Sequence, residues 1–220
     1  MLIKTDYLSM KSILTLLSLS SIAIFSSQIS HAQAIPCDST HNIAWKKMLC
    51  GTQFKQQRLS LNDKYLTAYQ VTDAPTQLLE VTQQLWLKRI QQCKSKRCFE
   101  EQIDQRSEEL NFYSSMNQSM TQHFIKYNQG KIAIPEVHIM VHQLSEDRIK
   151  IEGSAYLNPN NKSQQQQSSL FAYSSPNPKN PILDNDRRCS YQMTFHKALL
   201  VIQSKQTECQ RFTGHYRRYD

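Results

Sequence analysis

Apolar residues between positions 40 and 113 recur at intervals of three and four, which is the spacing of one face of an α-helix. The pattern predicts helices that carry the apolar residues Ile43, Trp45, Met48 and Leu49; Phe54, Leu61, Tyr65, Leu66 and Tyr69; Leu78, Leu79, Leu85, Trp86 and Ile90; and Phe99, Ile103, Leu110 and Tyr113. The connections between these segments are short, which favours antiparallel neighbours. This part of the chain is therefore predicted to be a compact helical unit.

The period changes to two near Pro135, where apolar residues alternate with others over residues 137–142. Such alternation is typical of a half-buried strand. A polar turn at residues 145–147, followed by apolar residues within 149–157, predicts a hairpin. Further strand-like segments lie at residues 189–195, 198–204 and 212–216.

Together these patterns predict an α+β fold. A disulfide-stapled, antiparallel helical domain over residues 35–115 is expected to be followed by a connector at 116–135 and a small antiparallel β domain at 136–220. Within the β domain, residues 158–187 contain a glutamine run and several prolines, and we expect a long polar loop there. So small a β core is expected to need a disulfide.

The first 34 residues have the composition of a secretory signal peptide. Two lysines precede an apolar stretch at 13–25 that is too short to span a bilayer, and a small-residue exit, Ala32-Gln33-Ala34, follows it. Met10 begins an equally good, shorter signal, so both Met1 and Met10 are candidate starts. An uncleaved anchor is the alternative interpretation. We expect cleavage near Ala34 and a periplasmic or secreted mature chain without a transmembrane segment.

The cysteines all lie beyond the predicted leader, at Cys37, Cys50, Cys93, Cys98, Cys189 and Cys209. An even number in an exported chain indicates disulfides, because oxidation persists outside the cytosol. Cys189 and Cys209 bracket two predicted strands and are expected to pair. The other four cysteines allow three pairings. An uninterrupted helix from 40 to 50 would hold Cys37 and Cys50 too far apart to form a disulfide, and a Cys93–Cys98 disulfide needs a turn between the two residues. Zinc is the alternative, but the chain has no C-x2-C.

The chain is basic, and its second half is the more basic one. Its formal net charge is +8, which falls to +7 without the charged residues of the leader, and residues 114–220 hold 13 basic against 8 acidic side chains. Such a bias favours anionic partners, and we expect an anionic envelope polymer rather than nucleic acid. A solvated basic surface is the plain alternative.

The helical half carries a characteristic order of cysteine, aromatic and charged residues. These are Cys37, Cys50, Leu59, Asp63, Leu66, Tyr69, Gln83, Trp86, Arg89, Cys93, Cys98, Arg106 and Leu110. In this order, residues 37–113 resemble the LprI-like family of bacterial envelope proteins, which are lysozyme inhibitors. The resemblance implies a helical fold, no cofactor, and inhibition of lysozyme by steric occlusion.

Two sets of charged residues are candidate contacts for such a partner. One is an acidic stripe that recurs every four residues in the last helix, Glu100, Asp104 and Glu108; the other is the basic loop Lys94, Lys96 and Arg97 between two cysteines. Lysozymes are typically cationic with an acidic cleft, so the stripe could meet the cationic body or the loop could enter the cleft. Alternatively, the stripe is only a solvated helix face and the loop only offsets its carboxylates.

Trp86 and Arg89 have two interpretations. The resemblance implies that Arg89 faces the partner with Trp86 supporting it. The interpretation that we favour places Trp86 in the helix core and pairs Arg89 with a carboxylate such as Asp63, because large aromatic residues at helical spacing are usually buried.

The sequence favours a protein that is not an enzyme and holds no metal. His138 and His142 would lie about 13 Å apart on a strand, too far to share one ion. The chain has no G-x-S-x-G, no H-E-x-x-H and no phosphate-binding loop. Its cysteines are expected to be paired, which leaves no thiol nucleophile.

Overall fold

The structure, a computed structural model, describes residues 33–37, 43–115, 118–161, 166–176, 181–186 and 188–219. Ala34–Asp220 form one compact unit, apart from Met1–Gln33. The predicted signal peptide therefore lies outside the described residues, except for its last two. The helical half and the β half of the chain both belong to this one unit.

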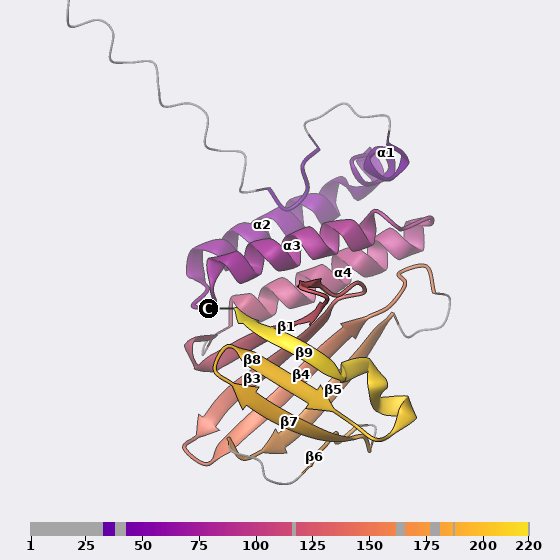
Figure 1. Cartoon of the computed structure of the whole chain (residues 1–220). Coiled ribbons are helices and arrows are strands. Elements are labelled where there is room, and N and C mark those ends of the chain that lie inside the picture. Colours follow the sequence, from indigo (N-terminus) through magenta and orange to yellow (C-terminus); the bar gives the residue numbers. More distant parts are fainter. Residues whose placement is uncertain are drawn as a thin grey trace, which may run out of the picture. The chain divides into compact units, whose positions relative to one another are not determined.

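The first half of the unit is helical (Figure 1). It consists of α1 (Ala44–Leu49), the short 3-10 turn η1 (Thr52–Phe54), α2 (Lys55–Val71), α3 (Thr76–Ile90) and α4 (Lys96–Tyr113). A single apolar core joins them, with Leu61, Tyr65, Leu78, Trp86, Phe99 and Leu110 among its buried members. The helices predicted from the apolar spacing are thus confirmed.

The inward face of α2 differs from the prediction. Leu61, Tyr65 and Ala68 are buried, whereas Leu66 and Tyr69 are 40% and 46% exposed. Each residue turns a helix by about 100°, so a side chain one position past the buried row already points away from it. The apolar residues of α2 therefore occupy two faces, and only one of them packs.

The disulfides join Cys37 to Cys50, Cys93 to Cys98 and Cys189 to Cys209. The pairing of Cys189 with Cys209 is as predicted. Cys37 reaches Cys50, with 5.7 Å between their Cα atoms, because α1 begins only at Ala44. Cys93 and Cys98 close the turn between α3 and α4.

The second half is an antiparallel sheet. Its strands are β1 (Thr121–Asn128), β2 (Lys131–Ile132), β3 (Val137–Ser145), β4 (Arg148–Tyr156), β5 (Gln167–Ser174), β6 (Ile182–Leu183), β7 (Ser190–His196), β8 (Leu199–Gln203) and β9 (Gly214–Tyr219). They lie in the order β5-β4-β3-β1-β9-β8-β7-β6, with β2 on the end of β1. The 3-10 turns η2 (Gln118–Met120) and η3 (Thr207–Phe212) precede β1 and β9.

The sheet curls so that its outermost strands meet. The backbone N–H of Asn185, just after β6, donates to the carbonyl of Phe171 in β5 at 2.8 Å, and the Asp184 carboxylate accepts from Phe171 N–H at 3.3 Å. Inside the curl lies a second apolar core, separate from that of the helices, which includes Ile139, Ile151, Leu170, Leu200, Phe212 and Tyr216.

Two segments expected to lack regular structure contain strands. The connector at 116–135 holds β1, which pairs with both β3 and β9 and so lies inside the sheet. Three consecutive residues of β1, His123, Phe124 and Ile125, are all buried. One face of the strand lies under the helices and the other lies in the sheet core, so its sequence does not alternate between apolar and polar residues. The polar region 158–187 holds β5, fully paired with β4.

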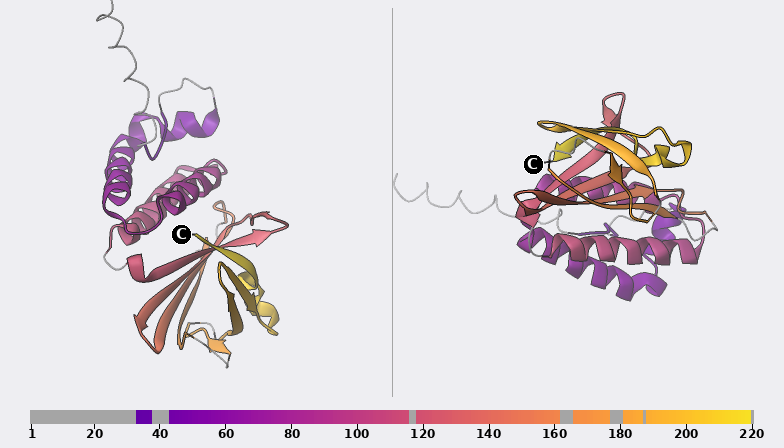
Figure 2. Two further views of the ribbon diagram at one scale, coloured as in Figure 1. Left: turned by 60° about the vertical axis from the view of Figure 1, so that its left-hand side comes forward. Right: turned by 90° about the horizontal axis from the view of Figure 1, so that it is seen from below.

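The helical layer covers one side of this sheet, with α4 next to it (Figure 2). The ring centroid of Phe112 in α4 lies 6.2 Å from the ring centroid of His123 and 5.8 Å from that of His142. Among the described residues, no helix has the length and apolar character that crossing a membrane requires.

Candidate functional site

A solvent-facing groove of about 970 Å³ lies between α4 and the segment that follows β4. Four residues predicted as partner contacts line it: Lys94, Arg97, Asp104 and Glu108. Residues of the sheet half, Asn160, Asn161, Gln166 and Gln167, supply the facing side. The structure thus brings most of the two predicted charged sets into one surface feature.

Lys96 and Glu100, the other predicted contacts, lie outside the groove. They form an ion pair one helical turn apart, 3.4 Å between Nζ and Oε1, with side chains 62% and 40% exposed. Such exposed pairs contribute little to stability.

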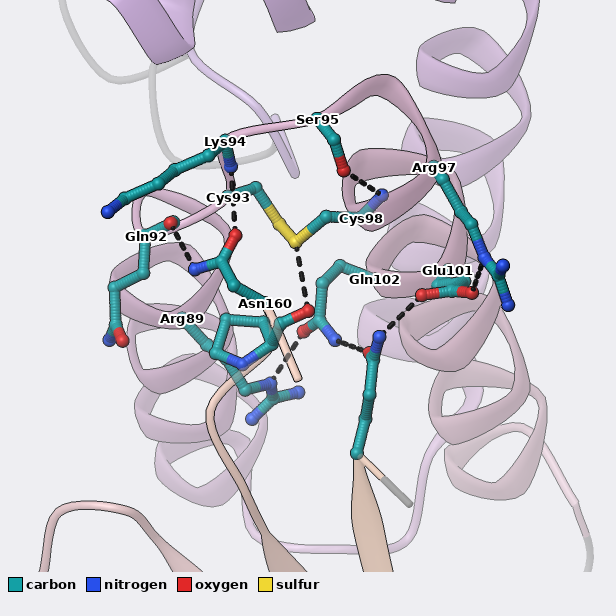
Figure 3. The surroundings of a disulfide bond; sticks show 12 residues. Arg89, Gln92, Cys93, Lys94, Ser95, Arg97, Cys98, Glu101, Gln102 and Asn160 are labelled. Carbon is teal, nitrogen blue, oxygen red and sulfur yellow. Dashed lines mark hydrogen bonds and ion pairs between the residues drawn. A yellow bond between two sulfur atoms is a disulfide. The ribbon is translucent and has the colours of Figure 1, made fainter. Parts of the chain in front are cut away.

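The end of the groove is fixed by the Cys93–Cys98 disulfide and by Asn160 (Figure 3). Asn160 accepts from the backbone N–H of Lys94 at 3.0 Å and donates to the carbonyl of Gln92 at 2.7 Å. Sγ of Cys98 lies 3.2 Å from the carbonyl oxygen of Pro159; because a disulfide sulfur carries no hydrogen, this is a polar contact and not a hydrogen bond. The basic turn is therefore held from both the helical and the sheet side.

The charges of this turn are partly neutralised by its own helix. Nε of Arg97 lies 2.6 Å from Oε1 of Glu101, and this hydrogen bond and the carboxylate charge raise the pKa of Arg97. Lys96 and Arg97 thus offset carboxylates of their own helix, as the alternative interpretation of the loop predicted. Within the described part of the chain, no ion pair involves Lys94, Asp104 or Glu108, so these charges remain available in the groove.

A ladder of side-chain amides forms the floor between α4 and β5. Gln102 donates to Gln105 at 3.2 Å and to Gln166 at 3.0 Å, and Gln105 donates to Gln167 at 2.6 Å. Gln166 in turn donates to Glu101. The groove therefore presents amides and carboxylates in fixed positions rather than an apolar surface.

Beneath the groove, several residues singled out by the resemblance are buried. Trp86 is fully buried and its indole N–H donates to the backbone carbonyl of Gln102 at 2.8 Å. Gln83 is buried as well, and donates to the carbonyl of Ala34 at 2.6 Å. The placement of Trp86 in the helix core agrees with the interpretation that we favoured.

Arg89 also lies inside the molecule, only 5% exposed, but its partners are not the one expected. It forms ion pairs with Glu136 and, at 3.4 Å, with Glu109, and its guanidinium lies 3.7 Å from the ring centroid of Tyr156. Asp63 is exposed on α2 and takes no part. Glu136 comes from the sheet half, so no spacing within the helices could have indicated it.

Arg106 and Glu109 complete this network. Nη1 of Arg106 lies 2.8 Å from Oε2 of Glu109, and its Nε donates to Gln83 at 2.9 Å. Burial alone would raise the pKa of Glu109, but the charges of Arg106 and Arg89 and the hydroxyl of Tyr156 outweigh it, so the pKa is lowered. Burial, followed by the charge of Glu109, raises the pKa of the Tyr156 hydroxyl, which donates to that carboxylate at 2.5 Å.

Histidines of neighbouring strands meet under the end of α4. Nδ1 of His123 lies 3.2 Å from Nε2 of His138, and Nε2 of His142 lies 2.7 Å from a Glu152 oxygen. Burial lowers the pKa of His138 to about 4 and that of His123 to about 2. The described residues contain no group of three or more His, Cys, Asp or Glu side chains placed to hold a metal. Sequence reasoning missed His123 because β1 was not foreseen.

The remaining motif residues of the resemblance, Leu59, Asp63, Leu66 and Tyr69, all lie exposed along α2. No known family model matches the chain, and no characterised protein and no solved structure is detectably similar to it. The LprI-like resemblance therefore rests on residue order in the helical half alone.

Proposed function

We propose that this protein is an exported inhibitor that binds a lysozyme and occludes it sterically, and that the groove beside the Cys93–Cys98 disulfide is its contact surface. The observation that carries the proposal is the gathering of Lys94, Arg97, Asp104 and Glu108 along this one groove. No bond of the partner needs to be made or broken in such a mechanism.

The rigidity of the groove favours binding. The disulfide and the two hydrogen bonds of Asn160 hold the turn in place before a partner arrives. A surface that is already ordered loses less conformational entropy on docking, so more of the contact energy appears as affinity.

Charge also fits a cationic partner at short range, although the whole chain is basic. Asp104 and Glu108 face the groove without ion-pair partners among the described residues. At physiological salt the screening length is about 8 Å, so the repulsion between two basic proteins is largely screened and nearby charges dominate. Complementary charges at such a rim mainly accelerate association.

The test is the lysozyme-catalysed clearing of a peptidoglycan suspension, with and without the oxidised mature protein, using lysozymes of several classes. Asp104→Asn/Glu108→Gln should weaken inhibition about tenfold or more, because both changed side chains lie in the groove. Glu146→Gln/Asp147→Asn removes the same charge from the exposed β3–β4 turn and should inhibit like the unchanged protein. Failure of a folded, oxidised protein to inhibit any class would refute the proposal.

A second candidate function is binding of an anionic envelope polymer. Exposed basic side chains of β7 and β9 share one patch with β8, where Leu199 lies opposite both His196 and Arg217 and Val201 lies opposite His215. Co-sedimentation of the mature protein with dextran sulfate beads probes this patch. Binding that Arg217→Gln reduces, in a protein that inhibits no lysozyme, would favour this function over the first.

A further inference from the structure

We infer that the interior of the helix–sheet interface is a binding site for a small, neutral, largely apolar molecule that carries one hydroxyl or carbonyl group. The site is a cavity of about 170 Å³ enclosed by α3 and α4 on one side and by β1, β3 and β4 on the other. It is separate from the groove and does not depend on the proposed inhibition of lysozyme.

The size and walls of the cavity indicate the size of the occupant. Apolar side chains contribute much of the lining, namely Leu85, Phe112, Ile125, Val137 and Met140. In another protein, an engineered apolar cavity of about 150 Å³ stays dry and binds benzene. A cavity slightly larger than that accommodates a single ring with one substituent.

The charges around the cavity exclude an ionic occupant. The lining includes two cations, Arg89 and Arg106, and two carboxylates, Glu109 and Glu136, which are paired with one another. A charged molecule would add an unbalanced charge in a site shielded from water, which is costly. The ligand is therefore neutral.

One polar group of the lining remains free to recognise a ligand. Oγ of Ser154 accepts from Nε2 of Gln167 at 2.6 Å, and within the described residues its own hydroxyl proton has no acceptor. A ligand oxygen placed at this end of the cavity would receive that proton. Phenol combines a ring of the right size with such an oxygen.

A second hollow adjoins the cavity at the Arg89–Glu136 ion pair. A hollow of about 210 Å³ shares Leu85, Arg89 and Glu136 with the lining of the cavity. The ion pair thus lies between the two spaces, and its displacement would connect them.

The experiment is an NMR titration of the oxidised mature protein labelled at its methionine methyl groups, with Met140 as the reporter inside the cavity. The Met140 signal is assigned with a Met140→Leu variant. Phenol should shift this signal saturably, whereas benzoate and benzylammonium, which have similar bodies and opposite charges, should bind at least tenfold more weakly. Equal binding of the charged probes would overturn the inference, as would an unmoved Met140 signal with phenol in the folded protein.

A pair of matched variants locates the site. Ser154→Leu fills the cavity and removes the hydroxyl, and should weaken phenol binding at least tenfold. Ser169→Leu makes the same change at the exposed residue opposite Ser154 on β5, and should leave phenol binding unchanged. If Ser154→Leu is folded and binds phenol as tightly as the unchanged protein, the cavity is not the site. If Ser154→Leu does not fold, Met140→Trp fills the cavity instead, and the loss of phenol-induced stabilisation gives the same test.

Discussion

The two sides of α4 carry the same kinds of charged residue in opposite situations. On the groove side, Arg97 and Glu108 are exposed to water, whereas on the side facing the sheet Arg106 and Glu109 belong to a network with Arg89 and Glu136. On the first side water solvates each charge. Replacing such a residue, or bringing it into contact with a partner, should therefore cost little free energy. On the second side each charge depends on its neighbours, and there it holds the helical layer to the sheet.

The sharpest test of this comparison uses two adjacent carboxylates. Glu109→Gln should lower the free energy of unfolding by about 3 kcal/mol or more, because it removes the counter-charge of the buried Arg106 and leaves Arg89 paired with Glu136 alone. Glu108→Gln, one position away but in the groove, should change it by less than about 0.5 kcal/mol. Urea unfolding of both variants measures the difference, and equal losses would show that the two sides of α4 do not differ.

Acidification should also lower the free energy of unfolding, through histidines buried under the end of α4. The pKa values of His123 and His138, about 2 and about 4, lie below the ordinary 6.5, so their stabilising contribution is complete above pH 6.5 and declines as the pH falls toward the folded-state values. In that range each of the two histidines lowers the free energy of unfolding by about 1.4 kcal/mol for every pH unit of acidification. The two together should therefore lower it by roughly 3 kcal/mol one unit below pH 6.5.

Urea unfolding between pH 7.5 and 5.5 measures this loss. Replacement of both buried histidines by Gln should flatten the dependence, since neither residue can then be protonated. The exposed His196 is the control, and His196→Gln should leave the slope as it was. An unchanged slope in the double variant would assign the pH dependence to other groups.

The disulfide at the groove should matter less for stability than for shape. Removal of Cys93–Cys98, which closes a loop with a sequence separation of 5, is expected to cost about 2 kcal/mol, against about 3 kcal/mol for Cys189–Cys209 with a separation of 20. Thermal unfolding of Cys93→Ser/Cys98→Ser and Cys189→Ser/Cys209→Ser compares them. Only the first should also weaken lysozyme inhibition, because only this bond lies at the groove.

The smallest effect is expected for the exposed ion pair of the groove. Arg97→Gln removes the ion-pair partner of Glu101 and should leave the free energy of unfolding unchanged within experimental error, because water screens an exposed pair. Its consequence should appear in association with a partner instead, as a change in the salt dependence of the rate. A loss of stability as large as that of Glu109→Gln would place Arg97 with the structural charges.

Much of this protein follows from its sequence. Periodicity located the helices and the β3–β4 hairpin, because the alternation of apolar and polar residues directly reflects a local contrast between core and solvent. The pairing of Cys189 with Cys209 followed from their positions around two strands. The charged sets that line the groove were recognisable because short spacings place them on one helix and the turn before it.

Tertiary structure decided the rest. β1 is buried on both faces and so lacks the alternation that would reveal it, and the strand at Gln167–Ser174 is concealed by its polar composition. Arg89 forms ion pairs with Glu109 of α4 and with Glu136, 47 residues away in the sheet half, and not with the expected Asp63. A local pattern shows which side chains are buried, but the partner of a buried charge depends on which elements pack together across the whole fold.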